Sequence, residues 1–387
     1  MKMKHNAEKN LKILIMLPRQ LGDVLLATPL AAVLREKYPT AIIDWWAHPM
    51  AKEILSDNPY LNHIYYLPVW NKKKFKNTFF LVKFFFWLKY VFAELSLFFQ
   101  IPKNKYDVVI DAINYPRSSL QALFTFAPTR ISFKCNSLRD YSYHILIDRE
   151  KLNQGYLGYT RLLLLEPLGI ELTKLDPLKT KLDLPILPEN KIKPKTWISE
   201  QLLALNARQF VVMSPTSRYL DRCWPIEHYT ELALLIIREF KVPVVWSRAP
   251  GEEEYILKVH ENLKRKLQQN SFAEHFSLLP PLMSIREITY LTSLAVGCVA
   301  NSNGMSHFAV ASGTKMIQLH GPTAPINWIP PNTEKYLGIQ KNTGCFGCSS
   351  NTCKLARHEC MEDILPATVF RKAVELFGLG EKHFTKI

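Results

Sequence analysis

The sequence predicts an α/β protein built from two parallel-sheet units. Short apolar segments alternate with helical segments in both halves of the chain, and a Pro- and Lys-rich stretch at 182–195 separates the halves. The 387 residues suffice for two domains, and 48% hydrophobic against 21% charged residues is typical of a globular chain. We therefore expect two Rossmann-like domains with a cleft between them, at 1–185 and 196–365, and a C-terminal helix at 366–387 that can pack back on the first domain.

In the first half, buried strands should alternate with helices. Pro39 ends the first long helix because proline cannot continue a helical hydrogen-bond ladder. The expected strands cover 11–17, 42–47 and 106–110, and the expected helices cover 24–37 and 50–56.

The second half repeats this pattern after the stretch at 182–195, which we interpret as an interdomain linker. Ser284 followed by Glu287 matches a capping box at a helix start. The expected strands cover 210–214, 242–247, 297–300 and 316–320, and the expected helices cover 225–239, 252–267, 284–293 and 306–311.

The net charge of +15 favours a polyanionic partner such as nucleic acid, anionic lipid or phosphorylated glycan. The sequence has no zinc-finger spacing, RNP-like aromatic strand or basic zipper, so we expect no nucleic acid. The first apolar segment is short, follows polar residues and lacks a small-residue cleavage site. It therefore resembles a first strand more than a signal peptide, and we expect a cytoplasmic protein with reduced cysteines.

Asp23 lies in the turn between the first strand and the first helix, where open α/β sheets place reactive groups. Such an Asp can cap the helix, or it can serve as a general base facing a cleft. The turn has no Gly-x-Gly-x-x-Gly pattern, so it is not built for a dinucleotide pyrophosphate.

Two loops of the second half have the chemistry of a phosphate site, although the first of them can also be an ordinary surface loop. The segment 214–224 offers hydroxyls, backbone amides and arginines before a helix. The segment 299–307 runs from a strand through a polar turn into a helix, where His307 is either a phosphate donor or a structural residue. The candidates are Thr216, Ser217, Arg218, Arg222, Ser302, Asn303, Gly304, Met305, Ser306 and His307.

Four segments resemble glycosyltransferase family nine, the lipopolysaccharide core heptosyltransferases, and lie closest to the heptosyltransferase III type. They are LKILIMLPRQLGDVLLATPLAAVLREKYP, DVVIDAINYPRSS, PTSRYLDRCWPIEHYTELA and NSNGMSHFAVASGTKMIQLHGPT. The resemblance covers most of 11–365 and implies the GT-B fold.

The resemblance also implies roles for individual residues. Asp23 would be the catalytic base, and Arg222 would stabilise the departing diphosphate. The candidates in the two second-half loops would bind the nucleotide sugar, with Glu252 at the ribose and Met283 near the adenine. Arg19 and Arg117 would face the acceptor.

The implied reaction is an inverting transfer of a heptose, or a related sugar, from ADP-heptose to a lipopolysaccharide inner-core acceptor. It needs no metal or other cofactor if arginines and helix N-termini absorb the charge of the leaving group, and the sequence has no Asp-x-Asp motif. Ser302 departs from the family pattern, which usually has Asp there. The alternatives are a member that binds nucleotide or glycan without turnover, a transferase for a different nucleotide sugar, an epimerase or hydrolase, and a polyanion-binding protein.

Four cysteines lie close together near the C-terminus. Cys345, Cys348, Cys353 and Cys360 could hold zinc, but only one pair has the familiar two-residue spacing. Reduced cysteines that shape a loop are the simpler interpretation.

Residues 70–101 combine a basic run with a long aromatic stretch. Lys83, Lys89 and Glu94 interrupt the stretch, which disfavours a membrane span. The segment is either a helix buried against the sheet or an interfacial helix that docks on the anionic inner membrane, which would make the protein peripheral on the inner face.

Overall fold

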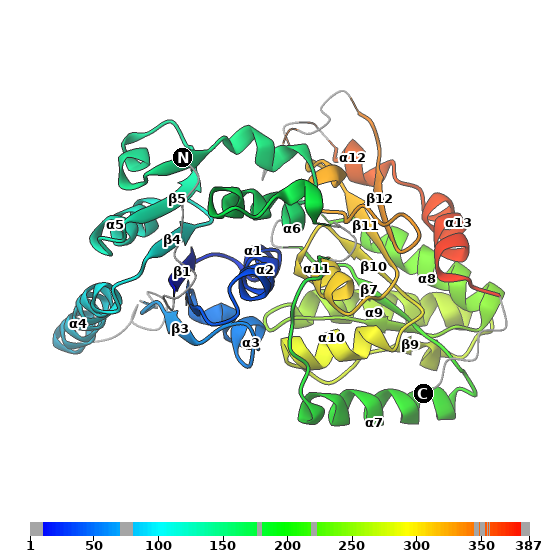
Figure 1. Ribbon diagram of the computed structural model, residues 1–387. Coiled ribbons are helices and arrows are strands. Elements are labelled where there is room, and N and C mark those ends of the chain that lie inside the picture. Colours follow the sequence, from blue (N-terminus) through cyan, green and yellow to red (C-terminus); the bar gives the residue numbers. More distant parts are fainter. Residues whose placement is uncertain are drawn as a thin grey trace. The chain divides into compact units, whose positions relative to one another are not determined.

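The computed structural model describes residues 11–69, 80–175, 180–217, 223–343, 348, 353, 355 and 357–380. The chain divides into two units, Met1–Pro185 and Ile186–Ile387. Within the described residues, each unit contains one six-stranded sheet with helices packed beside it (Figure 1). This is the predicted pair of Rossmann-like units.

In the first sheet, all neighbouring strands are parallel, in the order β3-β2-β1-β4-β5-β6. The strands are β1 Lys12–Leu17, β2 Ile42–Ala47, β3 His63–Tyr66, β4 Val108–Asp111, β5 Thr129–Phe133 and β6 Ile145–Ile147. The order reverses between β1 and β4, and in such sheets ligands bind outside the carboxyl ends at this switch point.

The first unit contains six α-helices in its described residues. They are α1 Leu21–Leu25, α2 Pro29–Lys37, α3 Lys52–Leu55, α4 Phe80–Lys103, α5 Pro116–Phe124 and α6 Leu157–Thr160. The single helix expected over 24–37 was wrong: α1 and α2 are separate. Pro29 has no N–H to donate, but it fits the first position of α2.

The second sheet repeats the topology, in the order β12-β11-β10-β7-β8-β9, again with parallel neighbours. The strands are β7 Val211–Ser214, β8 Val244–Trp246, β9 Ser277–Leu278, β10 Gly297–Asn301, β11 Met316–His320 and β12 Tyr336–Gln340. Its switch point lies between β7 and β10. The central strands are buried on both faces, which is why they read as apolar runs.

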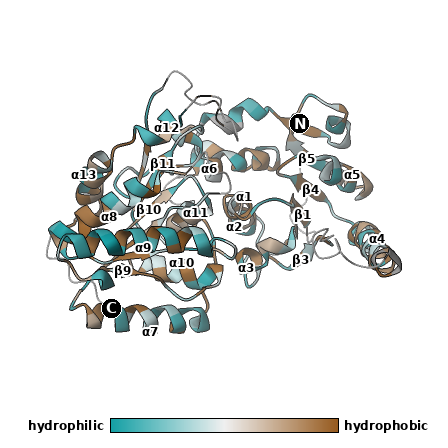
Figure 2. Cartoon of the chain, turned by 180° about the vertical axis from the view of Figure 1, so that it is seen from behind, coloured by the Kyte–Doolittle hydropathy of each residue, from teal (hydrophilic) through white to brown (hydrophobic). Residues whose placement is uncertain are grey.

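Helices surround the second sheet. They are α7 Pro188–Ala204, α8 Ile226–Phe240, α9 Glu253–Gln269, α10 Ile285–Ser293, α11 Gly304–Ala311, α12 Glu359–Glu362 and α13 Pro366–Phe377. In α9 the buried positions recur every three or four residues, and its outer face is polar (Figure 2). The predicted capping box of α10 is present, with Ser284 Oγ accepting from Glu287 N at 3.2 Å.

The linker predicted over 182–195 was wrong in its second part, because α7 begins at Pro188. Proline is tolerated in a first helical turn, so this Pro- and Lys-rich composition does not prevent a helix. The side chain of Lys193 donates to the carbonyl oxygen of Leu282, which ties α7 to the second unit.

The C-terminal helix α13 packs on α8 within the second unit. Phe377 is buried and fills the space beside Gly297 in β10. A Cβ at position 297 would lie 2.3 Å from the Phe377 ring, so glycine is required for this contact.

Candidate active site

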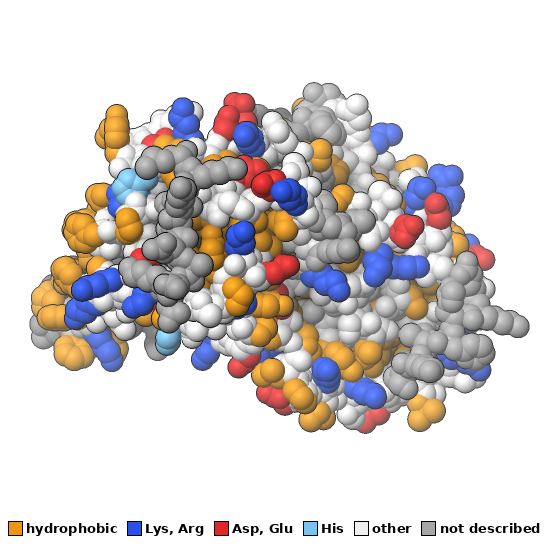
Figure 3. Space-filling model, viewed as in Figure 1, with side chains coloured by type: hydrophobic (Ala, Val, Ile, Leu, Met, Phe, Trp, Pro, Cys, Tyr) orange, Lys and Arg blue, Asp and Glu red, His pale blue; other side chains and the backbone are white. Residues whose placement is uncertain are grey.

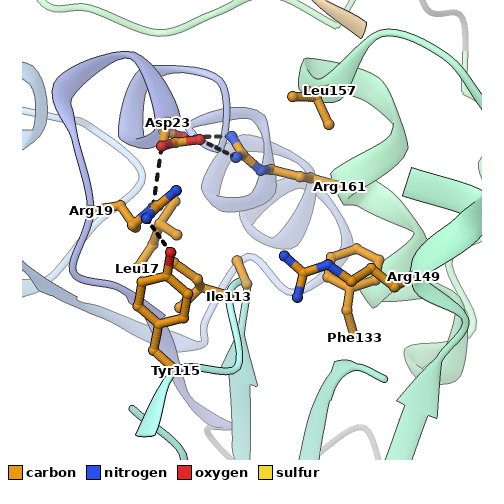
Figure 4. Close-up of a pocket in the computed structure, with 10 residues that line it drawn as sticks. Leu17, Arg19, Asp23, Ile113, Tyr115, Phe133, Arg149, Leu157 and Arg161 are labelled. Atoms are coloured by element: carbon orange, nitrogen blue, oxygen red, sulfur yellow. Dashed lines mark hydrogen bonds and ion pairs between the residues drawn. The ribbon is translucent and has the colours of Figure 1, made fainter. Parts of the chain in front are cut away.

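A cavity of about 180 Å³ opens at the switch point of the first sheet (Figure 4). Its lining comes from the turns after β1 and β4, from β5, and from the segment that follows β6. The lining residues are Leu17, Arg19, Asp23, Ala112, Ile113, Tyr115, Phe133, Arg149, Leu157 and Arg161. The cavity thus combines apolar walls with one carboxylate and three guanidinium groups.

Asp23 is the carboxylate of this cavity, and 17% of its side chain is exposed. The residue before α1, Gln20, occupies the capping position, and no side-chain hydrogen bond caps this helix. The carboxylate instead contacts Arg161, whose Nη2 lies 2.7 Å from Asp23 Oδ1. The helix-cap interpretation of Asp23 is therefore wrong, and the side chain lines the cavity.

Arg19 contacts both walls of the cavity. Its Nε lies 3.4 Å from Asp23 Oδ2, and its Nη1 donates to the hydroxyl of Tyr115. The guanidinium also lies over the Tyr115 ring, 4.8 Å from the centroid. These contacts join the turn after β1 to the turn after β4.

The turn after β4 is organised by Asp111, which is fully buried. Its Oδ1 accepts from the backbone N–H groups of Ile113 and Asn114, both at 3.0 Å. Burial raises the pKa of the Asp111 carboxyl, while these hydrogen bonds oppose that shift. The turn that carries Tyr115 is therefore held by a structural carboxyl that does not reach the cavity.

Arg117 does not line the cavity. Its Nη2 contacts the carboxylate of Glu94 on α4, and its guanidinium lies 6.0 Å from the Trp46 ring centroid. Burial together with the charge of Arg117 lowers the pKa of His48. The structure thus gives Arg117 a contact with α4, and its acceptor-facing role stays a prediction.

The second cluster of candidates lies at the switch point of the second sheet. Thr216 and Ser217 follow β7, while Ser302 to His307 follow β10, and these two strands are hydrogen-bonded neighbours. The two predicted phosphate loops therefore meet at one edge of the sheet.

Asn301, at the end of β10, holds the two ends of the loop that follows β7. Its Nδ2 donates to the carbonyl oxygen of Pro215 at 2.8 Å, and its Oδ1 accepts from Trp224 N at 3.0 Å. Tyr229 OH also donates to this Oδ1, at 3.1 Å. The side chain of Asn301 is fully buried, and its hydrogen bonds hold the ends of the loop in place, so it does not face a ligand.

Asn303 joins the two loops directly. Its Nδ2 donates to Thr216 O at 2.7 Å and to Ser214 Oγ at 3.0 Å. Its Oδ1 caps α11 by accepting from Met305 N and Ser306 N. The sequence pointed to these amides as phosphate donors, but they already have an acceptor within the chain.

The start of α11 is the remaining part of this cluster. His307 is 4% exposed, and its ring lies 5.7 Å from that of Trp328. On the neighbouring strand, burial and, to a smaller extent, the charge of His307 lower the pKa of His320 to about 3. Ser302 lies beside the next strand end, with its Oγ 3.5 Å from Thr323 Oγ1.

Glu252 and Met283 follow β8 and β9, at the same edge of the sheet. Glu252 Oε2 accepts from Ala249 N at 2.8 Å, so this carboxylate shapes the loop before α9. Met283 is half-buried and directly precedes the cap of α10. Their predicted places around a nucleoside stay predictions.

Three predicted candidates, Arg218, Arg222 and Cys345, lie outside the described residues, as does the basic run in 70–79. In the part of the chain that is described, no group of three or more His, Cys, Asp or Glu side chains could hold a metal ion.

The sequence pointed to Arg19 and Asp23 but missed Arg149 and Arg161. Arg161 comes 138 residues after Asp23, in the apolar run Arg161–Leu168, and no motif links the two. A single arginine that opens such a run is a signal for a buried ion pair, because an unpaired charge there would be costly.

A family model and the sequence relatives of this chain agree on one family. The model of "Glycosyltransferase family 9 (heptosyltransferase)" matches residues 95–358. Lipopolysaccharide heptosyltransferase 2 of Escherichia coli is 23% identical over 376 residues, covering 94% of this chain and 97% of that protein.

Two solved structures share the fold. The family 9 glycosyl transferase from Veillonella parvula has a TM-score of 0.75 at 17% identity, covering 97% of this chain and 99% of that one. The E. coli heptosyltransferase WaaC with ADP-2-deoxy-2-fluoro heptose has a TM-score of 0.65 at 17% identity, covering 94% of this chain and 99% of that one. The likeness confirms the GT-B class expected from the sequence.

Proposed function

We propose, from the premise that the chain belongs to glycosyltransferase family 9, that it transfers a heptose or related sugar from ADP-heptose to a lipopolysaccharide core acceptor. The acceptor is suggested by the name of the E. coli lipopolysaccharide relative, and the donor by the ADP-heptose analogue named with WaaC. The reaction would take place at the cytoplasmic face of the inner membrane, where the growing core is lipid-linked.

The observation that carries the proposal is the different chemistry of the two switch points. The first has a partly exposed carboxylate among arginines, and the second has hydroxyls beside the start of a helix. A carboxylate can take a proton from an acceptor hydroxyl, while hydroxyls and the positive end of a helix dipole favour phosphates. Group transfer from a nucleotide sugar to a hydroxyl needs both.

On the acceptor side, Asp23 is the general base. Arg161 holds its Oδ1, so the carboxylate has a fixed direction in the cavity. Arg19 and Arg149 line the same cavity and give it a positive charge, which suits an acceptor bearing a carboxylate or a phosphate.

On the donor side, Gly304 is the most informative residue. Its φ is not in the left-handed region, and the nearest atom to a Cβ built there is 3.9 Å away, on Phe308. Neither the backbone nor the packing therefore requires glycine at this position. A ligand that approaches the start of α11 would require it, and we assign this contact to the diphosphate.

The remaining donor contacts follow from position. Thr216 and Ser217 face the diphosphate from the loop after β7, and His307 does so from the first turn of α11. Met305 and Ser306 support the turn through their bonds to Asn303. Arg218 and Arg222, carried on the loop after β7, neutralise the leaving group, while Glu252 and Met283 receive the nucleoside.

The transfer is an inverting displacement. Asp23 takes the proton of the acceptor hydroxyl as its oxygen attacks the anomeric carbon, and the bond from that carbon to the diphosphate breaks. The negative charge that develops on ADP is absorbed by arginine and by the N-terminus of α11, without a metal.

A second candidate is a member that binds nucleotide without turnover. Ser302 favours it, because the hydroxyl near Thr323 replaces the carboxylate that the family pattern has at this turn. A serine can donate to a sugar hydroxyl but cannot act as an anion.

The test is incubation with ADP-heptose and a truncated core acceptor, with the product read by mass and ADP release measured. Asp23→Asn should abolish turnover and leave ADP affinity unchanged. Glu36→Gln, an exposed acid-to-amide change on α2, is the matched control and should retain activity. ADP binding without any transfer would support the second candidate, and turnover by Asp23→Asn would exclude Asp23 as the base.

A further inference from the structure

Helix α4 exposes an unusual amount of apolar surface for a helix of a globular unit. Such helices normally bury one apolar stripe. In the most apolar stretch of Phe84–Lys103, however, only 6% of the residues are buried. Phe85, Phe92 and Phe99 are spaced by seven residues, so they share one face, and they are 65%, 70% and 59% exposed. By length and composition alone the helix could cross a membrane.

The end of α4 is fixed to the rest of the first unit. Ile101 is fully buried in the core, and Phe98 packs on Phe124 of α5 with ring centroids 4.9 Å apart. Glu94 contacts Arg117 in the first turn of α5. A spanning orientation would have to break these contacts, so the structure favours a helix that lies along a surface.

The apolar surface continues from α4 onto the end of α5. The Phe124 ring lies 6.1 Å from that of Phe126, which is 76% exposed, and Leu120 and Leu123 beside them are 50% and 41% exposed. Figure 3 shows hydrophobic side chains gathered at this end of the first unit, with Lys and Arg side chains beside them. We call this the α4–α5 face: Phe85, Phe92, Phe99, Leu123, Phe124 and Phe126.

The sequence that contains α4 is strongly basic. Residues 72–105 contain eight Lys and a single acid, Glu94. The ion pair with Arg117 neutralises that acid, so no unpaired carboxylate within 72–105 would meet an anionic surface. Lysines near an anionic membrane add electrostatic attraction to the apolar contact.

We propose that the α4–α5 face docks on an anionic lipid bilayer, with α4 lying in the headgroup plane and its phenylalanines inserted. Exposed aromatics flanked by lysines have the composition of an interfacial helix. A second copy of the chain is a poorer occupant, because it would bring two lysine-rich surfaces together.

The α4–α5 face lies close to the cavity that holds Asp23. The N-cap of α5 is Tyr115, which lines the cavity, and the far end of the same helix carries Phe124. At 1.5 Å per residue, nine residues span roughly 13 Å. Docking would therefore place the cavity next to sugars just above a bilayer. This role in acceptor binding rests on the proposed function, whereas the docking itself does not.

Flotation of the full chain with vesicles tests the proposal. Phosphatidylcholine vesicles with phosphatidylglycerol should carry the protein, pure phosphatidylcholine vesicles should carry less, and high salt should release it. The triple variant Phe85→Gln, Phe92→Gln, Phe99→Gln should lose about tenfold or more in vesicle affinity. The matched control, Ile192→Gln, Leu203→Gln, Leu365→Gln, changes exposed apolar residues of the second unit and should float as before.

Two outcomes would overturn the docking proposal: no binding of the unaltered protein to the anionic vesicles, or equal binding of the triple variant. Light scattering that shows a dimer converted to monomers by the triple substitution, with vesicle binding unchanged, would assign the face to a second copy. Sugar transfer to a soluble acceptor without acyl chains should be the same in both variants. Its absence in the unaltered protein would count against the transferase proposal only.

Discussion

Arg161 holds both the side chain and the main chain of Asp23. Its Nη2 lies 2.7 Å from Asp23 Oδ1, and its Nη1 lies 2.6 Å from the Asp23 carbonyl oxygen. Only 7% of the Arg161 side chain is exposed, so this two-point contact is shielded from water. Asp23 is therefore fixed in position before any ligand arrives.

This contact makes Arg161 a positioning residue for the proposed base. Arg161→Lys keeps the charge but cannot make the forked contact, so the carboxylate should lose its fixed direction. We expect kcat to fall about 100-fold, because small misplacements of a reacting group have effects of this size. Steady-state kinetics should show little change in KM for the donor, and a loss confined to donor KM would contradict the assignment.

Asn303→Ala should lower both stability and nucleotide affinity. It removes the cap of α11 and the bonds to Thr216 and Ser214, a loss of about 2 kcal/mol in the free energy of unfolding. Denaturant titration and calorimetry of ADP binding would measure the two effects. As a control, Asn62→Ala removes a comparable hydrogen-bonding amide in the first unit and should leave ADP affinity unchanged. Equal ADP affinity in the two variants would show that the loops after β7 and β10 do not bind the nucleotide.

Ser302→Asp restores the residue that the family pattern has at this turn. If the carboxylate accepts from donor sugar hydroxyls, kcat/KM for ADP-heptose should rise about tenfold, the equivalent of about 1.4 kcal/mol. Ser302→Asn provides the uncharged control of nearly the same shape. An Asp variant no better than the Asn variant would mean that position 302 does not need an anion.

His320 should make the protein less stable in mild acid. Its pKa is lowered to about 3 in the folded state from the ordinary 6.5, so below pH 6.5 the unfolded chain binds a proton that the folded chain does not. The stabilisation that comes from keeping His320 neutral in the folded state is complete above pH 6.5, and it is lost as the pH falls towards 3. Between pH 7 and pH 5 the loss is about 2 kcal/mol.

Urea titrations at several pH values would measure this loss. His320→Asn should flatten the dependence of the free energy of unfolding on pH, whatever its effect on stability at pH 7. An unchanged slope in the variant would show that His320 is not the group responsible.

The elements that the sequence predicted well are those whose signals are local. β2 matches its expected range, and the Ser284–Glu287 capping box forms as expected. A short apolar run predicts a strand, and the three-residue spacing of a capping box predicts a helix start. Both signals depend only on residues close in sequence. The linker failed at Pro188 because proline is as acceptable at the first position of a helix as in a loop.

The candidate site was predictable only in part, for a related reason. Asp23 and the loops after β7 and β10 follow strands, and topology alone brings them to a switch point. Arg161 reaches Asp23 through tertiary packing across 138 positions of sequence, which no local pattern records. The sequence likewise did not show that Arg117 would contact Glu94.

The hydrogen bonds from Asn301 to Pro215 and Trp224 fix both ends of the loop that follows β7. Folding of the loop and recognition of the leaving group can therefore depend on different residues. Both ends of the loop are anchored to β10, so the anchoring does not depend on the residues between them. Natural variation at 218–222 can then retune recognition of the leaving group at little cost to folding. Substitutions inside this loop should accordingly change the free energy of unfolding less than substitutions of Asn301, even where they change activity.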